Sequence, residues 1–76
     1  MVTYEQRVAK MTKVGDETEQ LRLAKIYVRK LRNDAKKGDT LAEKLRLQDI
    51  VKQAEAVVRQ LRLNIFELED MLRAKV

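Results

Sequence analysis

The chain has 76 residues and a formal net charge of +5, and it contains no cysteine, histidine, proline or tryptophan. Without cysteine there is no disulfide framework and no thiolate zinc site. Without histidine a metal site would need carboxylates alone, and the usual side chain for proton transfer near neutral pH is missing. We therefore expect no enzyme, no metal site, no cofactor and no small-molecule ligand.

The length allows one domain, covering residues 1–76, whose small core favours well-packed helices or several copies that share it. No apolar run reaches the roughly 18 to 20 residues that cross a bilayer. Residues 1–5 have neither the basic start nor the apolar stretch of a signal peptide. We expect a soluble protein with no membrane partner, cytoplasmic on expression.

The first predicted helix is short and covers residues 4–14. Thr3 followed three residues later by Gln6 is a capping-box pattern, in which each side chain hydrogen-bonds a backbone N–H of the other residue. Apolar residues then recur at steps of four and three, which is typical of a helix with one buried face. These residues are Tyr4, Val8 and Met11.

The dipeptide Gly15-Asp16 leaves the connection to the next helix open. Glycine is favoured just past a helix end, and Asp16 with Glu19 matches a second capping box, which together predict a break. The other interpretation is a continuous helix that bends and tolerates Gly15 at a cost of about 1 kcal/mol.

The second predicted helix covers residues 17–37. It ends at Lys36-Lys37-Gly38, because cations in the last turn and a following glycine capable of left-handed capping both favour a C-terminus. Its seam repeats every three and four residues. The seam consists of Leu21, Ala24, Val28, Leu31 and Ala35.

The third predicted helix is the long helix 41–75, which starts at a capping box of Thr40 with Glu43 and contains neither glycine nor proline. We expect an unbroken rod of roughly 52 Å, at about 1.5 Å per residue. Its heptad seam consists of Leu47, Val51, Ala54, Val58, Leu61, Ile65, Leu68 and Leu72. The chain is thus expected to be an all-α antiparallel helical bundle.

The short connection at residues 38–40 sets an expected register, in which residue 40+n of the third helix faces residue 37−n of the second. In that register the second helix covers the third only to about Leu61. The remainder must then face the first helix or another chain, and we expect a homodimer. Either the hairpin has two long arms that pair into a four-helix bundle, or the first helix folds back onto it. The residues expected in the core or the self-association surface are Leu61, Ile65, Phe66, Leu68 and Leu72.

The second helix also carries a basic stripe, which is the candidate nucleic-acid site. A row of guanidinium and ammonium groups is suited to tracking phosphates, although it also serves as an ordinary solvated face. No aromatic residue interleaves with it, which argues against base stacking. The stripe consists of Arg22, Lys25, Arg29, Arg32 and Lys36.

Two segments resemble the helical domain of ribosome recycling factor. Residues 28–35 (VRKLRNDA) are similar to that family's Val-Arg-x-Ile-Arg-Arg-Asp-Ala helix, and residues 50–61 (IVKQAEAVVRQL) to its following helix. The resemblance implies that Arg29 and Arg32 match arginines that contact ribosomal RNA. It covers some 20 residues, and the family's inserted second domain has no counterpart here.

The whole chain also resembles a computationally designed helical protein. Average usage of about 5% would give roughly four prolines, yet none is present, and each predicted helix start carries a capping box. We therefore expect a designed scaffold that folds and self-associates, with no natural activity or compartment. The alternative is a small natural helical hairpin that binds a helical partner or structured RNA through the basic stripe.

Overall fold

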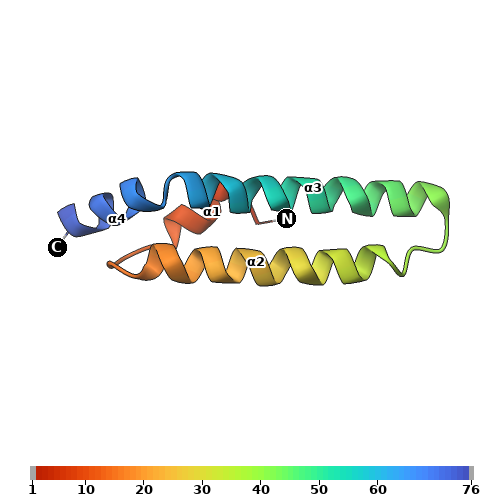
Figure 1. Ribbon diagram of the computed structural model, residues 1–76, viewed down its shortest axis with the longest axis horizontal. Coiled ribbons are helices and arrows are strands. Elements are labelled where there is room, and N and C mark those ends of the chain that lie inside the picture. The colour runs from red at the N-terminus through yellow and green to blue at the C-terminus, as the bar shows by residue number, and fades with distance from the viewer. Residues whose placement is uncertain (1, 76) are drawn as a thin grey trace.

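The computed structural model describes residues 2–75, which form four helices and no strand. These are α1 (Tyr4–Ala9), α2 (Asp16–Ala35), α3 (Leu41–Leu63) and α4 (Ile65–Ala74). Figure 1 shows α2 and α3 as an antiparallel hairpin, with α4 continuing α3 beyond a bend and α1 packed against the hairpin near its open end. The predicted all-α helical bundle is confirmed.

The described residues form a rod rather than a sphere, with extents of 50 × 16 × 14 Å. Its radius of gyration is 14.5 Å, against about 11 Å for a compact domain of this length. Among residues 2–75, each helix is too short or too polar to cross a lipid bilayer.

Helix α1 begins as predicted but ends at Ala9 rather than at residue 14. Both capping-box bonds are present, with Thr3 N–H donating to Gln6 Oε1 at 2.9 Å and Gln6 N–H to Thr3 Oγ1 at 3.2 Å. The early end has a local cause, because the Asp16 carboxylate accepts from the N–H groups of Thr12 and Lys13 at 2.9 and 3.2 Å. A longer helix would use those donors for its own carbonyls.

Gly15 breaks the chain rather than bending a continuous helix. Its φ of 103° lies in the region that side chains disfavour, and α2 starts directly after it. The second capping box was a wrong prediction: Glu19 binds Arg22 instead, while the Glu17 carboxylate accepts from the Gly15 N–H at 2.9 and 3.0 Å. This carboxylate is buried over the start of α2, where negative charge is favourable.

Helix α2 ends at Ala35, two residues before the predicted end. Gly38 does not serve as a left-handed cap, because among residues 2–75 the backbone has a positive φ at Gly15 and not at Gly38. Its small size has another use: a Cβ at this position would lie 2.9 Å from Lys44 Cγ. Glycine therefore lets the connection pass close to the first turns of α3.

The predicted rod over residues 41–75 is not continuous, because it divides at Asn64 into α3 and α4. Asn64 has φ −102° and ψ 9°, outside helical values. Asparagine is a poor helix former, and its Nδ2 donates to Tyr4 Oη of α1 at 3.1 Å. The bend is thus tied to the N-terminal helix.

The hairpin register also differs from the prediction. A turn at residues 38–40 would place Glu55 opposite Arg22, but Glu55 contacts Arg32 at 3.4 Å. The connection covers residues 36–40, and α3 begins farther along the rod than α2 ends (Figure 1), so the two helices are displaced relative to a tight turn. As a result α2 extends alongside α4, so part of the C-terminal half that was expected to need another copy is covered within the chain.

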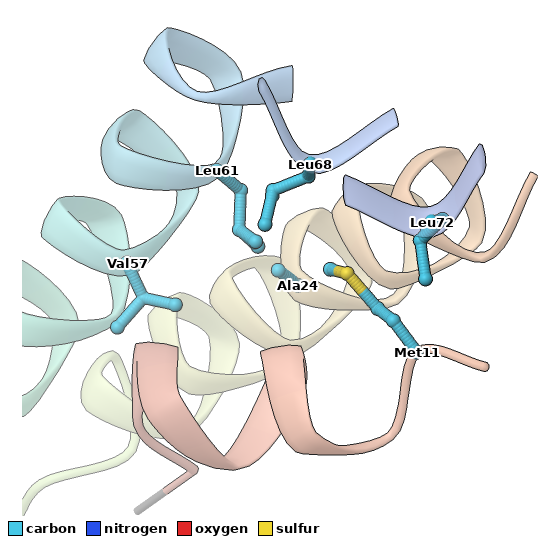
Figure 2. Packing of buried hydrophobic residues seen from close by; sticks show 6 residues of the cluster. All are labelled: Met11, Ala24, Val57, Leu61, Leu68 and Leu72. Carbon is cyan, nitrogen blue, oxygen red and sulfur yellow. The ribbon is translucent and has the colours of Figure 1, made fainter. Parts of the chain in front are cut away.

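The main core lies where α1, α2, α3 and α4 meet. Met11 follows α1 and inserts between α2 and α4, and Leu61 and Leu72 are fully buried (Figure 2). Partly buried Tyr4, Val8, Leu21 and Val58 surround this cluster. The cluster itself consists of Met11, Ala24, Val57, Leu61, Leu68 and Leu72.

Candidate functional site

An open groove runs along one side of the hairpin, between α2 and α3. It has two adjoining hollows, of about 410 Å³ and about 530 Å³, and Arg32 and Glu55 line both. Its apolar lining comes from Val28, Ala35, Val51 and Val58. We call it the cationic groove, because most of its other lining residues are basic.

Two rows of cations flank this groove. The row on α2 contains four of the five residues of the predicted basic stripe: Lys25, Arg29, Arg32 and Lys36. The row on α3 was not predicted, and it contains Lys44, Lys52, Arg59 and Arg62. All eight side chains belong to exposed residues.

The α3 row was missed because residues 38–76 carry seven acidic and seven basic side chains, so the charge of this half cancels when it is counted along the sequence. The four cations of the row follow one another at steps of eight, seven and three residues. That signal becomes visible once the side of α3 that borders α2 is known.

Arg22, the fifth residue of the predicted stripe, does not line the cationic groove. Its guanidinium donates to both carboxylate oxygens of Glu19, at 3.0 Å from Nε and 2.5 Å from Nη2. This hydrogen bonding lowers the pKa of Glu19 and raises the pKa of Arg22. Arg22 is therefore already paired, whereas the other four stripe residues face the groove.

Among the described residues that line the groove, one is acidic. This residue is Glu55, which lies near the middle of the groove. Its Oε2 lies 3.4 Å from Arg32 Nη2. Both side chains are largely open to water, so this ion pair contributes little to stability. Its effect is to hold Arg32 over the groove and to divide the cations into two groups.

The groove therefore offers eight cationic groups against one carboxylate, with an apolar floor. From Lys44 to Arg62 the α3 row extends roughly 27 Å, at about 1.5 Å per residue. Arginine forks pair with phosphate oxygens in a bidentate manner, and lysines act as point charges. A surface of this kind is complementary to a polyanion that has phosphates on two sides.

A second polar cluster lies at the buried α1–α2 contact. Arg7 is 5% exposed; its Nη1 donates to Gln20 Oε1 at 3.2 Å and its Cζ lies 5.9 Å from the centre of the Tyr27 ring. Burial lowers the pKa of Arg7, and its Nε has no hydrogen-bond partner in the described structure. Its residues line neither hollow of the cationic groove and pack two helices together, so we treat the cluster as structural.

The residues expected in the core or the self-association surface separate into two groups. Leu61, Leu68 and Leu72 are buried within the single chain, and Ile65 is half-buried. Phe66 is 76% exposed. Leu61, Leu68 and Leu72 are therefore shielded from water without a second copy of the chain, whereas Phe66 is not.

Among residues 2–75, no three acidic side chains converge on a point that could hold a metal ion. Comparison of the chain with protein-family models, with curated proteins and with solved structures finds no match in any of the three. The assignment of a function therefore depends on the geometry of the cationic groove.

Proposed function

We propose that the cationic groove binds the phosphate backbone of structured RNA. The observation that carries this proposal is the convergence of two basic rows, on separate helices, along one groove. A single basic stripe also serves as a solvated face, but two rows held side by side place like charges close together. Binding a polyanion relieves that repulsion and releases counterions.

The composition of the groove favours a folded strand over an extended one. Its lining contains no aromatic residue on which successive bases could stack. Helical RNA is recognised mainly by shape and by contacts to phosphates and ribose hydroxyls. The resemblance of residues 28–35 to ribosome recycling factor, with Arg29 and Arg32 as the matching arginines, supports the same class of ligand.

The test is binding of a fluorescently labelled RNA hairpin, measured by anisotropy at salt concentrations from about 50 to about 200 mM. We expect the logarithm of the affinity to fall linearly with the logarithm of the salt concentration. The variant Arg29→Glu plus Arg62→Glu removes one cation from each row, at positions without an ion pair to another described residue. It should weaken binding at least about tenfold and make the salt slope shallower by roughly one for each phosphate that the variant no longer neutralises.

The matched control is Lys30→Glu plus Arg46→Glu. It makes the same change in net charge at exposed positions of α2 and α3 outside the groove. We expect it to bind RNA several times more tightly than the groove variant. Equal losses in the two variants would show that net charge alone attracts RNA, and the proposal would then fail.

A designed scaffold with no natural activity is the second candidate, and composition and capping favour it, including the complete Thr3–Gln6 box. The orphan Nε of buried Arg7 counts against it, because design procedures remove buried unsatisfied polar groups. A scaffold should show no salt-dependent RNA affinity beyond that of the charge-matched control. If the groove instead binds a helical protein partner, an acidic peptide should displace the RNA from it.

A further inference from the structure

The side of α3 and α4 that points away from α2 carries four of the largest exposed apolar residues of the chain. Two lie near the start of α3, Leu41 at 75% and Leu45 at 57% exposed, and two lie at the bend to α4, Leu63 and Phe66, each at 76%. In Figure 1 this side is the long edge of the molecule opposite α2. We call it the outer edge.

Helical geometry places these four residues in line. Leu63 follows buried Leu61 by two residues, a rotation of about 200°, so it points away from the core. Leu45 and Leu63 are about five helical turns apart, and Leu41 and Phe66 about seven, so the members of each pair point the same way. The phase continues past Asn64, because Leu68 and Leu72 are buried on the same side as Leu61.

The spacing has the symmetry of a self-complementary surface. In an antiparallel contact between two copies, every pair of opposed residues must share one midpoint, and each contact occurs twice. The pair Leu45 and Leu63 has its midpoint at residue 54, and the pair Leu41 and Phe66 between residues 53 and 54. A single two-fold axis beside residue 54 would therefore bring both apolar pairs together.

The residues between the apolar pairs are compatible with that contact. In the same register the alkyl stem of Lys52 covers Ala56 of the other copy, and Arg59 faces Gln48, which can accept its hydrogen bond. At the centre, the small Ala56 side chain allows the helices to approach. The outer edge thus has apolar contacts at both ends. In the middle, no two side chains of like charge lie directly opposite each other.

From this arrangement we infer that two copies of the chain associate as an antiparallel dimer through the outer edge, with Leu45 against Leu63 and Leu41 against Phe66. The contact uses the side of α3 opposite the main core, so each hairpin keeps its own fold. A two-fold axis perpendicular to the paired helices leaves both cationic grooves on the same face. The dimer does not depend on RNA binding. Lys52 and Arg59 lie at the border between the groove and the outer edge and take part in the contact, so six groove cations of each copy stay clear of it, twelve on one surface.

Sedimentation equilibrium tests the association. We expect the protein to be dimeric at high concentration, and Leu45→Asp to weaken the dimer at least about tenfold, since a buried carboxylate would replace an apolar contact. The control is Ile26→Asp, an exposed apolar position of α2 outside the outer edge, which should leave the dimer unchanged. A monomer at all concentrations, or equal effects of the two variants, would overturn the inference.

Cysteine cross-linking tests the register, because the unsubstituted chain has no cysteine. The double variant Leu45→Cys plus Leu63→Cys should form a covalent dimer on oxidation. Within one chain these positions are roughly 27 Å apart at about 1.5 Å per residue, too far for an internal disulfide. Each single variant should remain uncross-linked. A covalent dimer of equal yield from Leu45→Cys alone would indicate a parallel contact and contradict the proposed register.

Discussion

The two ends of the hairpin differ in how completely they enclose apolar side chains. At the open end, α1 and α4 join α2 and α3, and Met11, Leu61 and Leu72 are almost completely removed from water. At the turn end only α2 and α3 are present, and Leu47 of the seam and neighbouring Ile50 stay half-buried. Two helices bury one stripe each, whereas a third element closes the core. Stability should therefore be concentrated at the open end.

The largest expected effect comes from truncating the core at the open end. Leu61→Ala should lower the free energy of unfolding by about 2 to 5 kcal/mol, because it leaves a cavity among fully packed neighbours. Leu47→Ala, the same substitution at a half-buried seam position of the turn end, should cost clearly less, about 1 kcal/mol. The measurement is urea unfolding of dilute protein, at concentrations too low for association.

Comparable losses from Leu61→Ala and Leu47→Ala would contradict the difference between the two ends. Native-state hydrogen exchange gives an independent check. Amides of α3 near Leu61 should exchange only through global unfolding, and those near Leu45 through local opening.

A medium effect is expected at Gly15, where the chain turns from α1 into α2. Gly15→Ala should destabilise by about 1 to 2 kcal/mol, because a residue with a Cβ is strained at φ 103°. Space is not the cause, as a Cβ here would meet no atom within 4 Å. Gly15→Asn should cost less, since asparagine tolerates positive φ better. Equal losses for the two variants in urea unfolding would contradict a backbone origin.

The smallest effect concerns pH and the loop that follows α1. Hydrogen bonds from the Thr12 and Lys13 N–H groups lower the pKa of Asp16 below its ordinary 3.8. A carboxyl with a lowered folded-state pKa stabilises the protein above its unfolded pKa, and that contribution is lost as the pH falls through the folded value. Stability should therefore decline below about pH 4, and less steeply in Asp16→Asn.

Thermal unfolding from about pH 2 to about pH 6 measures that decline. Glu19→Gln is a necessary comparison, because the hydrogen bond from Arg22 also lowers the pKa of Glu19. If Asp16→Asn reproduced the natural profile while Glu19→Gln flattened it, the acid sensitivity would belong to the Glu19–Arg22 pair at the surface of α2.

Much of the fold could be predicted from local signals. The Thr3–Gln6 box, the seam through Leu61, Leu68 and Leu72, and the start of α3 after Thr40 each depend on residues a few positions apart. The break at Asn64 could not be predicted in this way, because it involves Tyr4, 60 residues earlier in the sequence. Periodicity alone continued the helix across that position.

The candidate site was half predictable for a related reason. The α2 row follows from one helix and its three-four spacing, whereas the α3 row depends on which side of α3 borders α2. The expected register was wrong because the connection of residues 36–40 carries the start of α3 beyond the end of α2, which a tight turn at residues 38–40 would not do. This displacement moves every opposed pair along the hairpin, so Arg32 and not Arg22 meets Glu55.

The burial of Arg7 has a consequence for how the chain opens. Closing α1 over the hairpin strips water from a guanidinium that gains one amide oxygen and no carboxylate in return. The ring of Tyr27 and the amide of Gln20 offset only part of that cost. We therefore expect the N-terminal segment to detach more easily than the rest of the described chain, so that an intact hairpin with this segment undocked should be the most accessible partly opened state.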